Sequence, residues 1–488
     1  MMSSAQPAEV CASSGANSLF VGIVSSVAAL GGLLFGYDTA VISGAIGLLE
    51  THFHLGPAAT GWAASSALAG CVLGAGIAGQ VSDAIGRRVV ILLSAVMFLV
   101  SAVGTALTPD LALFVVFRIV GGLGIGAASM ASPLYIAEIA PARWRGRLVT
   151  LNQLAIVSGM LLIYFVNYEI VRYGTPQWNM SSGWRWMFAS GALPSVALLG
   201  LVFVVPETPR FLFLKGREDE ARRVAARIEG NSASELELHE LLVTIQHSGT
   251  TLPPAARRIG MIGIVLACLQ QVTGINVFLY YAPELFKHAG VGTDVALIQT
   301  VVLGGVNLAF TVFAMAFVDR IGRKPLWVAG AVGMGCCLCA VGLSMARAYF
   351  SGSLLLFALA YIAFFACSVG PVTWVILSEI FPLRFRGRLM AMATVALWMA
   401  NFVVSQTFPS LDQNPWLVQH FNHGFPFLVY ALFCFLGAWF VATQFPETKG
   451  KTLEEIEEWW TSNDLAQHSR RMNRRTFLAK EETKWQKA

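Results

Sequence analysis

The sequence predicts an all-α membrane protein with twelve transmembrane helices in two six-helix bundles, joined by short cytoplasmic helices. Three observations predict this fold. Of the 488 residues, 56% are hydrophobic and only 12% are charged, whereas soluble domains carry roughly 25% charged residues. Apolar runs long enough to cross a bilayer recur along the whole chain. Short charged motifs from the first half also reappear in the second half.

Twelve apolar runs reach the length of about 20 residues that spans a bilayer core. They are residues 19–49, 60–82, 89–107, 111–136, 148–168, 184–205, 258–286, 297–318, 326–346, 353–378, 389–409 and 424–445. With both termini inside, 28 of the 33 Lys and Arg residues fall on the cytoplasmic side, four fall outside and Arg118 lies within a run. The positive-inside rule therefore predicts cytoplasmic termini. No cleavable signal pattern precedes the first run, which is expected to act as an uncleaved targeting signal.

Three motif pairs define an internal repeat. The pairs are DAIGRR (83–88) with DRIGRK (319–324), EIAP (138–141) with EIFP (379–382), and PET (206–208) with PET (446–448). Their offsets of 236, 241 and 240 residues agree, which predicts two parallel six-helix repeats around a site near the bilayer midplane. The expected divisions are an N-terminal tail at 1–18, bundles at 19–205 and 258–445, linker helices at 206–257 and a C-terminal tail at 446–488.

The repeated motifs place acids and arginines where spans enter the cytoplasm. Ion pairs that form in one state and break in another would bias alternating access. Charge that merely sets topology explains the same residues equally well. The residues concerned are Asp83, Arg87, Arg88, Glu138, Arg145, Asp319, Arg323, Glu379 and Arg386.

Asp38 is the only formally charged residue between Val10 and Leu49. At about 1.5 Å per residue it lies roughly 20 Å before Thr51, too deep for its side chain to reach the membrane surface. An acid in this position indicates a proton or ion site, although a purely structural ion pair is the alternative. Arg118, the other charge within a span, is its natural partner because pairing offsets part of each burial cost. A carboxylate beside an arginine can load and release a proton as the geometry changes.

Neutral polar and aromatic residues within the spans indicate a site for a neutral polyol. Amides donate and accept hydrogen bonds, and indole rings can stack on a sugar face. On a helix, several polar residues of the seventh span can share one face around Gly274. Hydrogen bonding between helices is the competing explanation for any single amide. The candidates are Gln153, Gln270, Gln271, Asn276, Tyr280, Tyr281, Asn307, Trp374, Trp398 and Asn401.

The sequence lacks the motifs of several other functional classes. The chain contains no phosphate-binding loop, zinc-protease motif or nucleophile elbow, so neither an ATP-driven pump nor another enzyme is expected. No cofactor is predicted. Seven of the eight cysteines lie in apolar spans and predict neither disulfides nor a metal site. The basic residues form short clusters between spans, unlike a nucleic-acid-binding face.

At its motifs the chain resembles the sugar porter family of the major facilitator superfamily. The resemblance covers about residues 18–460 and rests on GGLLFGYDTAVISG (31–44), PETPRFL (206–212), QQVTGIN (270–276), GPVTWVILSEIFP (370–382) and PETKGKTLEE (446–455). It implies proton-coupled symport of a monosaccharide, D-xylose or a similar sugar such as glucose, in a bacterial inner membrane. Membrane lipid is the expected surrounding partner, and a monomer is expected. The resemblance implies Asp38 as the proton site with Arg118 as its partner. The implied sugar contacts are Phe35, Gln153, Gln270, Gln271, Asn276, Tyr280, Asn307, Gly370, Trp374 and Trp398.

Two departures from the family pattern leave alternatives open. Leu397 stands where many members have Asn or Gln, which removes one hydrogen-bonding group from the sugar ring. Gly191 stands where a family member carries an acid in the sixth span, which affects proton coupling. Xylose, glucose, galactose or another monosaccharide therefore fits. A facilitative uniporter is the second functional hypothesis, although uncoupled members usually lack the acid at Asp38, and a transporter-like sugar sensor is the third.

Overall fold

The computed structural model describes residues 17–141, 144–229, 254–288, 290–347, 353–382, 385–445 and 447–449, and the elements within these ranges are helices. The first half contains α1 (Ser18–Ala40), α2 (Ile42–Phe53), α3 (Pro57–Ile85), α4 (Arg87–Leu107), α5 (Leu111–Ile139), α6 (Arg145–Tyr173), α7 (Pro176–Trp178), η1 (Asn179–Gly183), α8 (Trp184–Ser190) and α9 (Ala192–Leu201). Next come α10 (Pro209–Leu214) and α11 (Glu218–Glu229). The second half contains α13 (Pro254–Val272), α14 (Ile275–His288), α15 (Thr293–Ile321), α16 (Arg323–Ala346), α17 (Ser353–Phe364), η2 (Phe365–Val369), α18 (Gly370–Ile380), α19 (Arg386–Asp412), α20 (Pro415–Phe421) and α21 (Phe425–Gln444).

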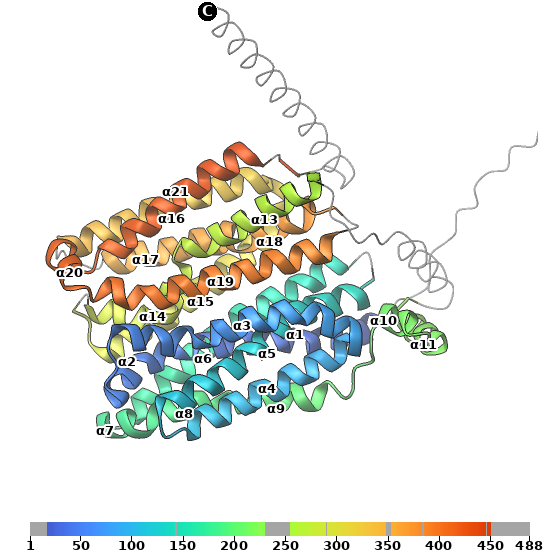
Figure 1. Cartoon of the computed structure of the whole chain (residues 1–488), viewed down its shortest axis with the longest axis horizontal. Coiled ribbons are helices and arrows are strands. Elements are labelled where there is room, and N and C mark those ends of the chain that lie inside the picture. The colour runs from blue at the N-terminus through green and yellow to red at the C-terminus, as the bar shows by residue number, and fades with distance from the viewer. Residues whose placement is uncertain are drawn as a thin grey trace, which may run out of the picture.

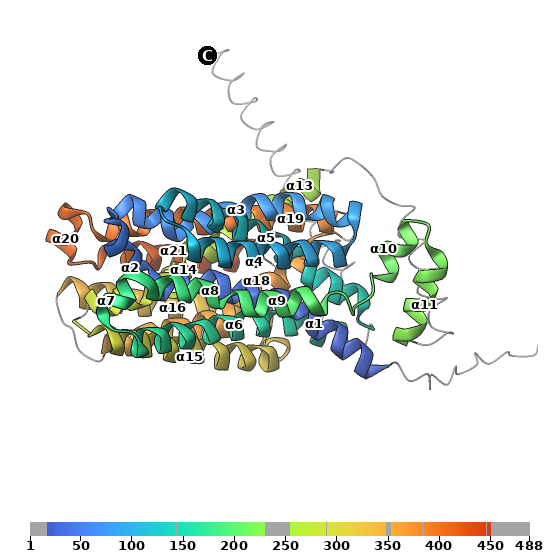
Figure 2. The same cartoon turned by 90° about the horizontal axis from the view of Figure 1, so that it is seen from below.

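The long helices run roughly side by side, with the first half and the second half as neighbouring bundles (Figure 1). The short helices α10 and α11 lie at one end of the molecule, which we call the charged end because the repeated acid and arginine motifs are there. The short helices α7 and α20 lie at the other end, which we call the opposite end (Figure 2). The predicted all-helical fold is confirmed.

Within the described ranges, eleven helices are long and apolar enough to cross a membrane. They correspond to eleven of the twelve predicted spans. The sixth predicted span, 184–205, is divided into α8 and α9 at Gly191 and ends at Leu201, so neither part reaches spanning length alone. Gly191 keeps helical angles of φ −62° and ψ −19°, so the two parts continue in nearly the same direction.

Other spans are interrupted near their middle. Gly274, with a φ of +85° that favours glycine, breaks the span between α13 and α14, whereas Val41, between α1 and α2, keeps helical angles and donates to the Tyr37 carbonyl as in a continuous helix. The π-helical turn η2 precedes α18. Interrupted membrane helices free backbone groups and are found where such groups line a binding site. These breaks make the centre of the protein a candidate site.

The two halves pack against each other through α3 with α19, α6 with α15 and α2 with α14. The Ser65 hydroxyl donates to Oε1 of Gln406 at 2.7 Å, and the Gln406 amide donates to the Ala58 carbonyl at 3.1 Å. Further toward the opposite end, the Gln413 amide donates to Oε1 of Glu50 at 3.3 Å. The halves are therefore closed together at the opposite end.

Candidate functional site

Asp38 and Arg118 form a buried ion pair near the middle of the first span. Nη1 of Arg118 lies 3.0 Å from Oδ2 of Asp38, and Nη2 donates to the Asp38 backbone carbonyl at 3.2 Å. The arginine side chain is 1% exposed and the aspartate side chain 13%. The guanidinium also lies over the ring of Phe188, 5.4 Å from its centroid. Since α1 carries Asp38 and α5 carries Arg118, the pair ties these two helices together.

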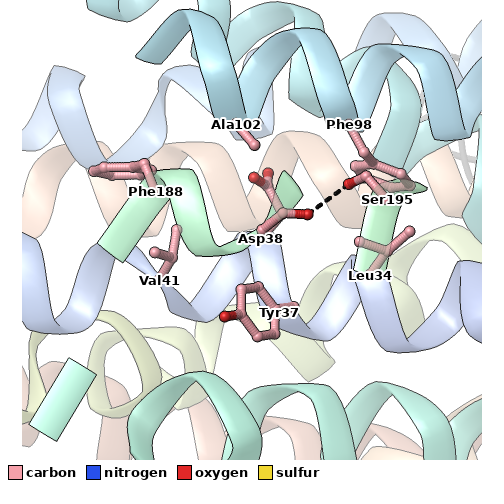
Figure 3. Close-up of a pocket in the computed structure, with 9 residues that line it drawn as sticks. Leu34, Tyr37, Asp38, Val41, Phe98, Ala102, Phe188 and Ser195 are labelled. Carbon is pink, nitrogen blue, oxygen red and sulfur yellow. Dashed lines mark hydrogen bonds between the residues drawn. The ribbon is translucent and has the colours of Figure 1, made fainter. Parts of the chain in front are cut away.

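A small cavity borders Asp38 (Figure 3). It offers about 10 Å³ to the centre of a water molecule, which is room for about one water. The residues that line it are Leu34, Tyr37, Asp38, Val41, Phe98, Ala102, Phe188, Gly191 and Ser195. The Ser195 hydroxyl donates to the Gly191 carbonyl at 2.7 Å, the bond dashed in the figure. A cavity of this size next to a partly accessible carboxylate has room for the water through which a proton would be exchanged.

Gly191 therefore lies beside the ion pair. A Cβ atom there would have the Phe188 carbonyl oxygen at 3.3 Å, Ala102 at 3.5 Å and Tyr37 at 3.7 Å as nearest neighbours. The position is not tightly closed, so an acid at this point in the family pattern would share the cavity with Asp38. This chain has a single carboxylate in the cavity lining.

A second polar group forms at the break between α13 and α14. The Gln270 amide donates to the Gly370 carbonyl at 2.9 Å, and the Asn276 amide donates to Oε1 of Gln271. The Gln271 amide contacts Oε1 of Gln270 at 3.4 Å. The three amide side chains are 3–7% exposed. These three side chains lie together around Gly274, as the sequence indicates, but they do so through the break between α13 and α14, which brings Asn276 back to Gln271, and not on one continuous helix.

Aromatic rings meet across the two halves at the centre of the molecule. Phe35 of α1 and Trp398 of α19 have ring centroids 5.3 Å apart, inclined at 56°. The indole Nε1 of Trp398 is buried and makes no hydrogen bond within the described structure. Leu397, the preceding residue, is 3% exposed. On the neighbouring helix, Tyr280 accepts from the Asn401 amide at 3.4 Å. The unpaired indole N–H is therefore a donor available to a ligand.

The structure does not join every candidate to these groups. Asn307 is 5% exposed and Gln153 and Trp374 are partly buried. Within the described chain these three side chains make no hydrogen bond and no ring contact. Gln153 and Asn307 lie on α6 and α15, which pack together across the halves. Their polar groups are free to bind a ligand at this boundary.

The charged motifs build matching ion-pair clusters in the two halves. In the first half, Arg87 pairs with Asp83 at 2.8 Å and with Glu138 at 3.1 Å. Arg88 donates to the carbonyls of Val202 and Phe203, both at 3.1 Å. These contacts join α3, α4, α5 and the end of the sixth span within one half.

The second half repeats this arrangement with Arg323 and Glu379, 3.0 Å apart. Arg386 donates to the Phe381 carbonyl at 3.4 Å. The side chains of Arg145 and Asp319, which belong to the same predicted clusters, lie outside the described residues. The described ion pairs of both clusters join helices of the same half, and their role in switching stays a prediction.

The repeated PET motifs have a structural role that sequence reasoning missed. Glu207 accepts backbone N–H bonds at the start of α4, including one from Arg87 at 3.1 Å, and Thr208 donates to Glu138 at 2.7 Å. Glu447 and Thr448 make the equivalent bonds to Arg323, at 3.1 Å, and to Glu379, at 2.6 Å. Burial raises the pKa of the Glu207 carboxyl, although these N–H bonds oppose the shift. The nearly equal offsets of the three motif pairs were the signal in the sequence that the PET motifs and the charged motifs contact one another.

Comparison with known proteins agrees with this architecture. Residues 24–460 match the family described as sugar (and other) transporter. The D-xylose-proton symporter of Escherichia coli K12 is 44% identical over 478 residues, covering 91% of this chain and 96% of that protein. The arabinose-proton symporter of Bacillus subtilis is 40% identical, covering 90% and 95%. The glucose facilitated diffusion protein of Zymomonas mobilis is 41% identical, covering 89% and 96%.

Solved structures of the xylose transporter XylE are similar over nearly the same range. The proton:xylose symporter XylE bound to 6-bromo-6-deoxy-D-glucose matches with a TM-score of 0.79 and 44% identity, covering 91% of this chain and all of that one. The inward-open XylE from E. coli matches with a TM-score of 0.80 and 42% identity, covering 90% and 100%. The chain is therefore an integral membrane protein of the sugar transporter family, with the fold of the major facilitator superfamily.

Proposed function

We propose that this chain is a proton-coupled monosaccharide symporter that works by alternating access in a bacterial inner membrane. The observation that carries this proposal is the buried pair of Asp38 and Arg118 beside a water-sized cavity. Ionisable residues inside a membrane are costly and are typical of proton relays and ion pathways. The names of two relatives, a D-xylose-proton and an arabinose-proton symporter, support the same activity.

Asp38 is the proposed proton-binding group and Arg118 its partner. When Asp38 is ionised, the guanidinium holds it and ties α1 to α5. When Asp38 is protonated, the charge attraction is lost and the two helices are free to separate. A conformational equilibrium shifts only when its states differ in affinity for the ligand. The pair supplies this difference because it is intact in one arrangement and weakened in the other.

The sugar is proposed to bind between the halves, held mainly by the second. The amides of Gln270, Gln271 and Asn276 satisfy one another without sugar, and they can exchange these bonds for sugar hydroxyls. The unpaired indole of Trp398 supplies a further donor. A substrate with several hydroxyls and no charge fits this set, in accord with D-xylose or a similar pentose or hexose. Phe35, Gln153, Tyr280, Asn307, Gly370 and Trp374 complete the proposed site.

The charge distribution supports an orientation with the charged end in the cytoplasm. In that orientation, the hydrogen bonds of Gln406 and Gln413 close the periplasmic side. The arrangement then corresponds to a state from which sugar leaves toward the cytoplasm. We propose that the transporter functions as a monomer, because each chain contains both halves of the site.

A facilitative uniporter is the second candidate, and one relative favours it. The Zymomonas protein is named a glucose facilitated diffusion protein and is 41% identical to this chain, close to the identities of the two symporters. Overall similarity therefore does not separate coupled from uncoupled transport. The distinction depends on whether Asp38 exchanges a proton during the cycle.

The test is uptake of labelled xylose, arabinose, glucose and galactose into proteoliposomes, with and without an inward-acid pH gradient. A symporter accumulates its sugar above the external concentration only with the gradient. A uniporter equilibrates its sugar under both conditions. A chain that binds sugar without moving it would be a sensor, and this result would contradict both transport hypotheses.

A further inference from the structure

Two histidines and a buried aspartate meet at the opposite end of the second half. His288 is the last residue of α14, Asp412 is the last residue of α19 and His423 lies between α20 and α21. Nδ1 of His423 is 3.1 Å from Oδ1 of Asp412, and Nδ1 of His288 is 3.4 Å from Oδ2. One ligand atom from each residue lies within 4.8 Å of the other two. The cluster lies away from the proposed sugar and proton sites.

The carboxylate of Asp412 requires a positive charge beside it. Its side chain is 4% exposed, and the two imidazoles are its described partners. The neighbouring ammonium of Lys287 is paired with Glu284 at 2.8 Å. A buried carboxylate without a cation is strongly unfavourable.

The histidine nitrogens lie close enough to the carboxylate oxygens to share one metal ion with them. Nδ1 of His288 is buried and makes no hydrogen bond, although it lies near Oδ2 of Asp412. In the tautomer of neutral imidazole that carries its proton on Nε2, this nitrogen points a lone pair at the carboxylate oxygen, whereas the tautomer protonated on Nδ1 would donate to it. A metal ion converts the same lone pairs into ligands. Zinc takes His and carboxylate ligands at about 2.0–2.2 Å, so neighbouring ligand atoms are about 3.3 Å apart in tetrahedral geometry. The two nitrogen-to-oxygen separations, 3.1 and 3.4 Å, are of this size, and the three ligand atoms together lie within 4.8 Å of one another.

We propose that His288, Asp412 and His423 form a zinc-binding site that ties the end of α14 to the end of α19. Zinc sites with three protein ligands leave the fourth position to water. Both helices also pack against the first half, α14 on α2 and α19 on α3. Gln413, next to Asp412, bonds to Glu50 of α2. Zinc at this site would hold the opposite end in its closed arrangement.

The test is a calorimetric titration of zinc chloride into the full-length protein after chelator treatment. We expect one ion per chain, with an affinity that falls by about tenfold to a hundredfold or more in His288→Gln, His423→Gln or Asp412→Asn. His420→Gln is the matched control. His420 lies nearby on α20, is exposed and has its Nδ1 2.8 Å from the Trp416 carbonyl. This variant is expected to bind zinc as the wild type does.

A second measurement guards against variants that fold poorly. Zinc is expected to raise the unfolding temperature of the wild type and of His420→Gln, and to leave that of Asp412→Asn unchanged. Absence of zinc binding by the wild type would overturn the proposal, as would equal binding by the His288→Gln/His423→Gln double variant. Because neither measurement requires sugar or a pH gradient, the result is independent of the proposed transport function.

Discussion

Replacing Asp38 by Asn should convert gradient-driven accumulation into simple equilibration. The side chain keeps its shape and an oxygen that can accept from Nη1 of Arg118, at the 3.0 Å contact seen here. The second bond, from Nη2 to the backbone carbonyl of residue 38, does not depend on the side chain. The amide cannot exchange a proton, so the sugar is expected to bind and cross without coupling.

The size of the effect follows from the number of protons carried. The cavity lining contains one carboxylate, that of Asp38, so one proton per sugar is expected. A gradient of one pH unit supplies about 1.4 kcal/mol per proton, which drives a neutral sugar to roughly tenfold accumulation. In Asp38→Asn the expected ratio falls to one. The protein should also lose about 3–5 kcal/mol of stability, because Arg118 is left as a buried charge without its counter-charge.

The assay compares uptake driven by a pH gradient with exchange of labelled for unlabelled sugar in the same proteoliposomes. Exchange shows that the variant is folded and binds sugar. Asp294→Asn is the control, since it makes the same change at an exposed position at the start of α15. Tenfold accumulation by Asp38→Asn would refute the assignment and place the proton site elsewhere.

Four further predictions test other parts of the structure. Gly191→Ala should be tolerated and should raise the unfolding temperature slightly, because Ala favours a helix more than Gly does. Gly36→Ala should prevent folding, because its Cβ atom would overlap the Ile156 backbone. Equal unfolding temperatures of the two variants would contradict this reasoning. Glu379→Gln removes the ion pair with Arg323 at the charged end. It should increase the labelling of a cysteine introduced into the half of α19 nearer the charged end. Unchanged labelling would mean that the cluster only sets the membrane topology. Trp398→Phe keeps an aromatic ring but loses the unpaired indole donor, so calorimetry should show sugar affinity weaker by roughly 1–2 kcal/mol. Leu397→Gln should change the ranking of xylose, glucose and galactose in binding assays, and an unchanged ranking would place this side chain outside the site.

The membrane fold was predictable because it depends on properties that hydropathy and repetition record directly. Long apolar runs must cross the bilayer as helices, and three motif pairs whose offsets agree to within five residues require two similar halves. The pairing of Asp38 with Arg118 was also predictable, because two opposite charges buried in the spans each need a partner. The structure has them in direct contact at 3.0 Å.

Other features depend on backbone geometry and on contacts between distant segments. The division of the sixth span at Gly191 leaves no mark in hydropathy, and the break at Gly274 changes which amides meet. The role of Glu207 requires knowing that α4 begins beside it. The cluster of His288, Asp412 and His423 combines three separate segments, and none of them alone resembles a metal-binding motif.

The arrangement of α1 gives a physical reason for coupling proton binding to sugar movement. Phe35 and Asp38 lie three residues apart on this helix, so they are neighbours on nearly the same face. Phe35 contacts Trp398 of the other half, while Asp38 is held by Arg118 of α5. In the proposed mechanism, protonation of Asp38 would weaken the tie between α1 and α5, and a movement of α1 would displace Phe35 against Trp398 at the proposed sugar site. A uniporter needs the aromatic contact between the halves but has no need of an ion pair one helical turn away. Because α1 carries both the aromatic contact of Phe35 and the ion pair of Asp38, the arrangement favours coupled transport over facilitated diffusion for this chain.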